Sequence, residues 1–189
     1  MRSLRCAGSD LGYSAVAAAS AVRQKPSVPV AAVVEGAVVS IDNSFRYPLD
    51  VRFFEVDSLG VVFNMWYLGW CDEAMSAFMD SIGYGYATLR ASGMDAVLRK
   101  AELEWLDSLQ AFQQAEVAVR VEQVGTTSFR LDFDISRIGV QTPAGPAETG
   151  RQPVLCARVA ITYVCVDIVG RKTAPIPAGL RQALVTDQA

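Results

Sequence analysis

One segment, residues 65–82, limits the fold of this chain more than any other part of the sequence. Its apolar residues recur at steps of three and four, as one face of a helix requires, and Gly69 is its only glycine. Trp66 and Trp70 make a second side of the same helix apolar. A helix that is apolar on two sides is usually buried among other elements. The sequence therefore predicts a central helix about 27 Å long, ended by Gly83.

The remainder of the chain is mostly strand. Strict alternation of apolar and polar residues predicts an antiparallel sheet with one buried face, and a continuous β-branched run predicts a central strand. One strand before the helix and about four after it place the chain in the α+β class, with a sheet wrapped on a single helix. The predicted strands are 51–56, 100–105, 117–122, 129–136 and 154–169, with a turn at 125–127, a loop at 138–153 and a short terminal helix at 180–184.

Residues 1–44 differ in composition from the rest. Alanine, serine and valine dominate them, and we expect an N-terminal extension, loose or with one extra strand, before a domain of residues 45–189. The most apolar part, 11–22, is interrupted by glycine, tyrosine and serine, whereas a signal peptide needs a continuous apolar segment. The longest apolar runs fall short of the ~20 residues of a membrane span. The four cysteines lack C-x-x-C spacing, which favours reduced, buried thiols in a cytoplasmic protein.

The sequence contains no histidine, which removes several mechanisms at once. A Ser-His-Asp or Cys-His nucleophile, a histidine-based zinc site and an imidazole general base all need that side chain. Chemistry must therefore use carboxylates, hydroxyls, amides, cysteines, basic side chains or backbone N–H groups. A net charge of −3 and a pI of about 5.0 disfavour a nucleic-acid partner, because phosphate neutralisation needs a basic surface. We expect no metal and no cofactor.

The turn at residues 56–64 is the strongest candidate for chemistry. Asp57 stands where the predicted strand ends, and Asn64, a good N-cap residue, begins the long helix seven residues later. The free N–H groups of a helix N-terminus carry partial positive charge and suit a developing oxyanion. A carboxylate opposite such a terminus can support hydrolysis. The alternative is that Asp57, close before Gly60, only forms an Asx-turn.

The same stretch resembles the signature of the hotdog-fold acyl-CoA thioesterases, and most closely that of their 4-hydroxybenzoyl-CoA thioesterase branch. The resemblance covers roughly residues 45–185 in the family's order. Its parts are the signature at 51–68 with Trp70, Glu73 and Ala74, the β-turn at 125–128, and the last strand and tail at 164–170 and 175–177.

This resemblance implies a hotdog fold, in which an antiparallel sheet wraps one long helix. It further implies a homodimer or homotetramer with active sites at the dimer interface, and a CoA or acyl-carrier-protein thioester as substrate. Asp57 matches the catalytic aspartate, acting as nucleophile or as general base on water, and Gly60 matches the loop glycine beside the thioester. Asn64 falls where many members carry histidine, so we expect its backbone N–H to bind the thioester oxygen, with its amide side chain as an extra donor.

Further residues are candidates for substrate binding, each with a structural alternative. Trp66 replaces a usually smaller polar residue, which suggests a changed acyl pocket. The alternatives are core packing for Tyr67, an ion pair with arginine for Glu73, turn formation for Thr127 and Ser128, and a solvated charged face for Arg130. Val61, Trp66, Tyr67, Glu73, Thr127, Ser128 and Arg130 complete the predicted site.

Two other functions compete with thioester hydrolysis. Hydratases and dehydratases also occur on this fold, but their sites pair a histidine with a carboxylate, and this chain has no histidine. A non-catalytic protein that binds or senses acyl-CoA remains the alternative. Tight binding of a CoA ester without turnover would identify it.

Overall fold

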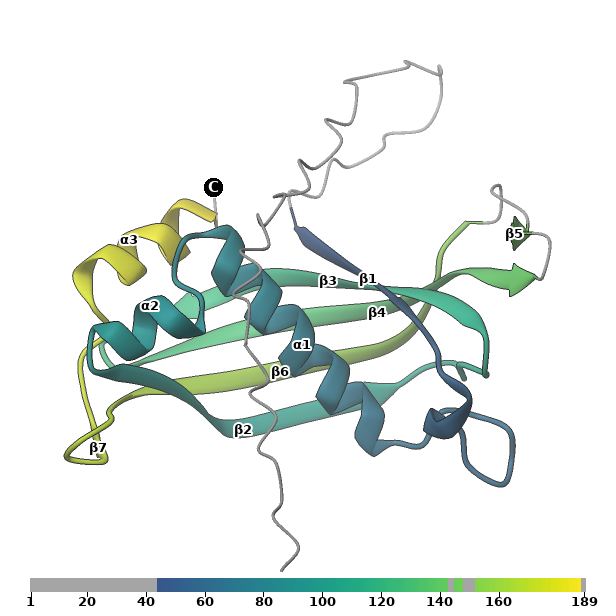
Figure 1. Ribbon diagram of the computed structural model, residues 1–189, viewed down its shortest axis with the longest axis horizontal. Helices are drawn as coiled ribbons and strands as arrows, with labels where there is room; N and C mark the ends of the chain where they lie inside the picture. The colour runs from purple at the N-terminus through teal and green to yellow at the C-terminus, as the bar shows by residue number, and fades with distance from the viewer. Residues whose placement is uncertain (1–43, 143–144, 148–151, 188–189) are drawn as a thin grey trace, which may run out of the picture. The chain divides into compact units, whose positions relative to one another are not determined.

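Residues 44–142, 145–147 and 152–187 are described by the computed structural model in Figure 1. Nearly all of the predicted N-terminal extension lies outside these residues, so its boundary at 44 stays a prediction. The strands are β1 (Phe45–Asp50), β2 (Met94–Trp105), β3 (Gln113–Val124), β4 (Ser128–Thr142), β5 (Gly145–Ala147), β6 (Val154–Asp167) and β7 (Lys172–Thr173). The helices are the 3-10 turn η1 (Phe53–Glu55), α1 (Met65–Ser81), α2 (Tyr86–Ala91) and α3 (Ala178–Asp187).

The described strands form one antiparallel sheet of seven strands. Its order is β1-β3-β4-β6-β2, with β5 paired to β4 and β7 paired to β6. Figure 1 shows α1 running across one face of this sheet, with α2 and α3 near the end of α1. The predicted α+β arrangement of a sheet on one long helix is confirmed.

The core lies between α1 and the inner face of the sheet. Alternate residues of β3 and β4 point inward, so the period-2 prediction holds for these strands, and β6 lies between β4 and β2 as the predicted central strand. On α1, the buried side chains follow the predicted helical spacing. The fully or nearly fully buried residues include Val117, Val119, Leu131, Phe133, Val159 and Ile161 of the sheet, and Tyr67, Trp70, Cys71, Ala74 and Phe78 of α1. Cys71, Cys156 and Cys165 are free buried thiols, as predicted; Cys6 lies outside the described residues.

Helix α1 ends as the sequence predicts. Gly83 has a φ of +82°, a conformation that side chains with a Cβ rarely adopt. Its N–H donates to the Asp80 carbonyl at 3.0 Å, and the N–H of Tyr84 donates to the Met79 carbonyl at 2.8 Å. These two bonds are those of a Schellman motif, which satisfies carbonyls left free at a helix end.

The predicted strand at 51–56 is wrong. The first strand is β1, which ends at Asp50, and the chain then forms η1. The predicted alternation does not continue along this segment, because Val51 is buried in the core but Phe53 and Phe54 are both exposed. A side-chain to backbone bond favours the tight turn instead, because the Glu55 carboxylate accepts the Arg52 N–H at 2.7 Å.

The predicted loop at 138–153 is also partly wrong. Strand β4 continues to Thr142, and β5 pairs back onto it in register Val140 with Ala147. Glycine and proline weaken a strand but are tolerated at an edge or at a hairpin, where fewer ladder bonds are lost. The terminal helix α3 begins two residues earlier than predicted and is longer, and the short helix α2 was not predicted.

Candidate active site at the loop before α1

The loop between η1 and α1 is closed by backbone hydrogen bonds. Val56 and Val62 form an antiparallel bridge, and the Asp57 N–H donates to the Val61 carbonyl at 2.8 Å. The Gly60 N–H donates to the Asp57 carbonyl at 3.0 Å, with Gly60 at a φ of +76°. A left-handed residue is therefore needed at the tip, which explains glycine there without reference to substrate.

Asp57 is half-buried and partly held by this loop. Its Oδ1 accepts the Leu59 N–H at 2.8 Å, which is the predicted Asx-turn. Its Oδ2 accepts no hydrogen bond from the described residues. The turn fixes the orientation of the carboxylate and leaves one oxygen available, so turn formation and a chemical role are compatible.

Asn64 stands immediately before α1, at the N-cap position, without capping it through its side chain. Its backbone is already helical, with φ −49° and ψ −35°, and its side chain makes no capping hydrogen bond. An N-cap residue needs an extended backbone to aim its side chain at the next turn, so the predicted capping role is wrong. The turn starts one residue earlier, since the Trp66 N–H donates to the Phe63 carbonyl at 3.0 Å.

The helix N-terminus therefore presents free donors. Within the described part of the chain, the N–H groups of Asn64 and Met65 have no acceptor, and both residues are exposed. Such N–H groups at the positive end of the helix dipole can bind an oxyanion. The sequence pointed to the N–H of Asn64; the N–H of Met65 beside it was not singled out.

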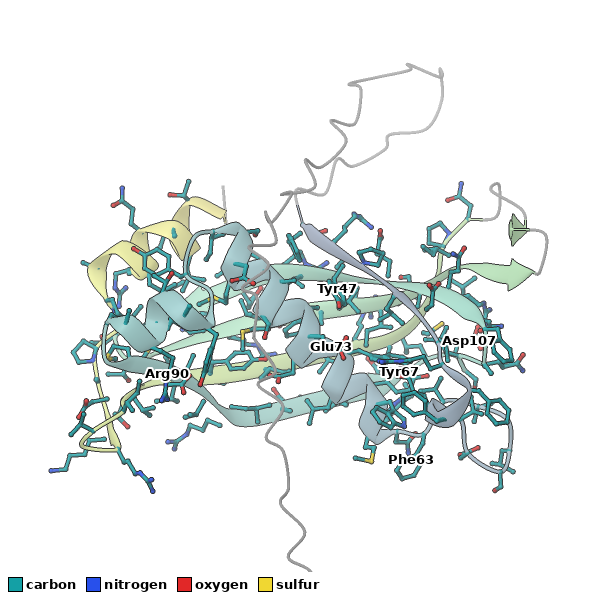
Figure 2. All side chains as sticks on the ribbon, viewed as in Figure 1. Tyr47, Phe63, Tyr67, Glu73, Arg90 and Asp107 are labelled. Carbon is teal, nitrogen blue, oxygen red and sulfur yellow. The ribbon has the colours of Figure 1, made fainter. Side chains whose placement is uncertain are left out.

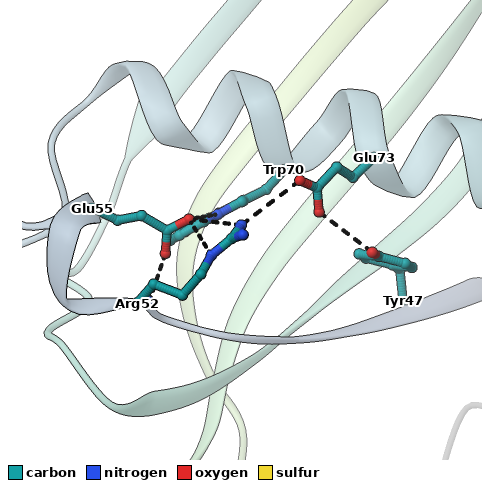
Figure 3. A network of polar contacts seen from close by, with 5 residues as sticks. All are labelled: Tyr47, Arg52, Glu55, Trp70 and Glu73. Carbon is teal, nitrogen blue, oxygen red and sulfur yellow. Dashed lines mark hydrogen bonds and ion pairs between the residues drawn. The ribbon is translucent and has the colours of Figure 1, made fainter. Parts of the chain in front are cut away.

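A buried carboxylate, Glu55, ends η1 just before the loop and is directed towards Arg52 and Trp70 (Figure 3). Its side chain is completely buried and accepts the Arg52 N–H at 2.7 Å and the Trp70 Nε1–H at 3.1 Å. The Arg52 guanidinium adds Nε–H at 3.0 Å and Nη2 at 3.0 Å. Arg52 and Glu55 stand three residues apart, a spacing that could have suggested the pair, but Trp70 is brought in only by the fold.

Glu73 extends the same network towards the surface of α1 (Figure 3). It lies 3.7 Å from Arg52 Nη2 and accepts the Tyr47 hydroxyl at 3.4 Å. Burial and the neighbouring Glu73 carboxylate raise the pKa of Tyr47. The predicted alternative for Glu73, a helix carboxylate paired with arginine, is thus observed.

Tyr67 and Trp66 differ in burial, and therefore in how much of each side chain a ligand could contact. Tyr67 is buried against Trp70, at 5.2 Å between ring centroids, and burial raises its pKa against the lowering effect of a hydrogen bond with the Leu109 backbone. Core packing, the alternative predicted for Tyr67, is observed. Trp66 is half-buried and meets the exposed Phe54 edge to face at 5.4 Å. Figure 2 places Phe63 and Tyr67 near the start of α1.

Several aromatic residues near Asp57 were not predicted as part of the site. Phe112 stacks on Phe53 at 6.3 Å between ring centroids, and both are exposed. Phe112 belongs to a segment that runs beside the loop, because the Val62 N–H donates to the Leu109 carbonyl and Val61 bridges Gln110. No local pattern in the sequence connects residues 109–112 with residues 53–62.

Thr127, Ser128 and Arg130 do not join Asp57 within one chain. Thr127 and Ser128 lie at the β3–β4 turn, near α2 and α3 and away from the loop before α1 (Figure 1). Arg130 follows the buried Phe129, so it faces away from α1, and it binds Glu102 at 3.0 Å and Asp132 at 3.3 Å. The turn and the charged outer face, predicted as alternatives for these residues, are both observed.

Among residues 44–142, 145–147 and 152–187, no group of three or more His, Cys, Asp or Glu side chains could hold a metal ion. No helix in the described ranges is long and apolar enough to cross a membrane.

The chain is similar in sequence to one protein family and to several known proteins. The family described as the thioesterase-like superfamily matches residues 51–184. A putative esterase of Aquifex aeolicus is 29% identical over 89 residues, covering 47% of this chain and 70% of the relative. A 1,4-dihydroxy-2-naphthoyl-CoA hydrolase of Synechocystis is 24% identical over 75% of this chain and 95% of its own. A chloroplastic acyl-acyl carrier protein thioesterase of Arabidopsis thaliana is 30% identical, but the match spans only 44% of its length.

Solved structures show the same fold. The 1,4-dihydroxy-2-naphthoyl-CoA thioesterase Slr0204 from Synechocystis superposes with a TM-score of 0.62 at 24% identity, over 75% of this chain and 96% of its own. The Dynemicin thioesterase gives a TM-score of 0.65 at 23% identity, over 76% and 96%. At these identities the likeness concerns the fold, and the predicted hotdog fold is confirmed.

Proposed function

The chain belongs to the thioesterase-like superfamily, and from this premise we propose that it hydrolyses the thioester bond of an acyl-CoA or aroyl-CoA substrate. The proposal rests chiefly on one arrangement. Asp57 has an available carboxylate oxygen on a closed loop, and that loop leads directly into a helix N-terminus with free N–H groups.

In the proposed reaction, the N–H of Asn64, helped by that of Met65, binds the thioester carbonyl oxygen as it becomes negative. Asp57 then acts in one of two ways. Its carboxylate attacks the carbonyl carbon to form a mixed anhydride, which water hydrolyses, or it takes a proton from a water that attacks the same carbon. In both cases the C–S bond breaks, a C–O bond forms, and the thiolate leaves and takes up a proton.

The names of the relatives support the substrate class. One relative acts on 1,4-dihydroxy-2-naphthoyl-CoA and another on acyl-acyl carrier protein, so both carriers stay within the proposal. Trp66 and Val61 would border the acyl group, and the exposed rings of Phe53, Phe54 and Phe112 would extend that border. A large apolar or aromatic acyl group fits this composition.

We further propose that the complete site includes a second subunit. Within one chain Thr127, Ser128 and Arg130 lie away from Asp57, so they could contact the CoA portion only at the partner's site. Glu73, exposed near the middle of α1, would face this shared region as well. A homodimer or homotetramer is the expected assembly.

The test is hydrolysis of a panel of acyl-CoA and aroyl-CoA esters, followed by thiol release. Asp57→Asn should lower kcat by about 10²- to 10⁴-fold, the usual contribution of a group that transfers a proton in the transition state. Asp50→Asn is the matched control, since Asp50 is exposed at the end of β1. A fully active Asp57→Asn enzyme would refute the role of Asp57.

A non-catalytic acyl-CoA binding protein is the competing function. Titration calorimetry with the same panel separates the two, because such a protein would bind CoA esters tightly and release no thiol. Binding with turnover, abolished by Asp57→Asn, supports the hydrolase.

A further inference from the structure

Glu55 is the one buried charged side chain in the described part of the chain, and the proposed reaction does not use it. A buried carboxylate is retained only when donors compensate for its loss of water. Here the donors are the main-chain N–H and guanidinium of Arg52 and the indole N–H of Trp70. All lie between 2.7 and 3.1 Å from the carboxylate oxygens, so the group is fully engaged.

The backbone of Glu55 holds the residue before the N-terminus of α1, and its side chain holds a residue within the helix. Its carbonyl accepts the Phe63 N–H at 2.9 Å, immediately before the helix N-terminus at Asn64. Its carboxylate accepts the Trp70 Nε1–H at 3.1 Å. Trp70 is six residues beyond Asn64, about 9 Å further along the helix axis. Two attachments this far apart fix the direction of the helix relative to the segment that carries Asp57.

Arg52 holds the start of the segment that carries Asp57. Arg52 binds Glu55 through its main chain and its guanidinium, and so fixes η1, whose last residue is two positions before Asp57. The guanidinium also lies 5.2 Å from the centre of the Phe54 ring, which packs on Trp66 in the first turn of α1. The contacts of Glu55 and Arg52 thus reach both the segment that carries Asp57 and the first turns of α1.

We propose that Glu55 is a positioning residue, which sets the Asp57 carboxylate against the N–H groups that begin α1. The inference rests on the proposed hydrolysis at Asp57 and adds a residue that never touches substrate. Misplacing a reacting group by about 1 Å can cost about 10²-fold in rate. Loss of this attachment should therefore lower kcat and leave KM nearly unchanged, since binding of the CoA portion does not depend on it.

Glu55→Gln is the variant of choice, because it keeps the volume and replaces one acceptor oxygen with an NH₂ group that faces other donors. We expect kcat to fall about 10- to 100-fold with KM within about 3-fold of the parent. We also expect the amides of residues 56–65 to exchange hydrogen roughly tenfold faster, relative to the amides of β4 in the same sample. Trp70→Phe removes the indole donor together with part of a buried ring but leaves the Arg52 contacts of Glu55, and it should give a smaller change of the same kind.

Leu184→Ala is the control for a purely structural effect. Leu184 is completely buried on α3, outside the candidate site, so its truncation should lower the thermal stability at least as much. Measured well below its melting temperature, this variant should keep the parent kcat and the parent exchange ratio for residues 56–65. If Glu55→Gln does not fold, Trp70→Phe decides the question by the same two measurements.

The outcomes separate this inference from the proposed function. If Asp57→Asn is inactive while the folded Glu55→Gln and Trp70→Phe variants keep the parent kcat, the positioning role of Glu55 is wrong and the hydrolase assignment stands. If kcat falls but residues 56–65 exchange as in the parent, the positioning role is equally wrong. If Asp57→Asn keeps full activity, or the parent hydrolyses none of the esters, the proposed function fails, and the inference that rests on it fails too.

Discussion

Tyr163 carries a hydroxyl that is buried without a hydrogen-bond partner among the described residues. Its ring stacks on Phe129 at 5.4 Å between centroids, and this contact does not involve the hydroxyl. An unsatisfied buried polar group costs about 1–3 kcal/mol. Tyr163→Phe should therefore raise the free energy of unfolding by about 1 kcal/mol, measured by urea denaturation.

Tyr67→Phe is the matched comparison for that prediction. The Tyr67 hydroxyl is also buried, but it has a hydrogen bond with the Leu109 backbone. Removing it should lower the free energy of unfolding by about 1 kcal/mol, because the Leu109 group then loses its partner. Equal effects of the two substitutions would contradict the difference in their surroundings.

The free energy of unfolding should fall in alkaline solution because of the buried Cys165 thiol. Burial raises the pKa of this thiol to about 11 from its ordinary value of 9.0. The folded chain then holds the proton more tightly than the unfolded chain, so the stabilisation is complete below pH 9 and is lost as the pH rises towards 11. Burial also raises the pKa of Cys71 and Tyr163, which adds to the effect in the same direction.

The measurement is the free energy of unfolding at intervals between pH 9 and pH 11, the window set by Cys165. Cys165 alone should contribute a decrease of at most about 1.4 kcal/mol per pH unit. Cys165→Ala should make the fall in this window less steep, whatever it costs in packing, and the remaining slope comes from groups such as Cys71 and Tyr163. A stability that is constant or rises with pH would contradict the prediction.

At the scale of secondary elements, two glycines of the same region should respond oppositely to alanine. Gly69 lies in the middle of α1, and a Cβ built there meets nothing within 4 Å, so Gly69→Ala should stabilise by about 1 kcal/mol. Gly60 has equally open space but a φ of +76°, so Gly60→Ala should destabilise by about 1–2 kcal/mol. Thermal unfolding compares the two variants directly.

Activity gives a second comparison for the same pair. Gly60→Ala distorts the loop that orients Asp57 and should lower kcat. Gly69→Ala acts through helix propensity and should change stability only. If Gly60→Ala matched the parent in both stability and kcat, the positive φ of the loop would not be a requirement.

At the scale of the whole molecule, the sheet has two edges. Strand β1 forms one edge and the 12-residue β2 forms the other. A long edge strand presents unpaired N–H and carbonyl groups, which favours pairing with another chain. We expect light scattering to give a mass of two or more times the 20.4 kDa of one chain, and a monomer at all concentrations would contradict the shared site.

A mixing experiment tests the shared site itself. Asp57→Asn and Thr127→Glu should each be poorly active alone, the second because a new negative charge opposes the CoA phosphates. Mixed dimers contain one site with both native residues, so subunit exchange should restore part of the parent activity. No recovery in demonstrably mixed dimers would show that Asp57 and Thr127 do not serve the same site.

The sequence alone determined the features that local patterns encode. Periodicity gave α1 and the inward faces of β3 and β4, because a segment buries one face whatever its neighbours are, and a continuous β-branched run gave the central strand β6. The conformational needs of Gly60 and Gly83 and the Asx-turn of Asp57 were equally local. The motif at 51–68 also led to the family.

Only the tertiary structure decided the contacts that join distant segments. It turned residues 53–55 into η1 and gave Asn64 a helical backbone without a cap. It also brought Trp70 to the Glu55 carboxylate, set Phe112 beside Phe53, and placed Thr127 away from Asp57. The physical reason is that such contacts depend on the register of the sheet and the direction of α1 across it. Those are properties of the whole packing arrangement, which no window of sequence contains.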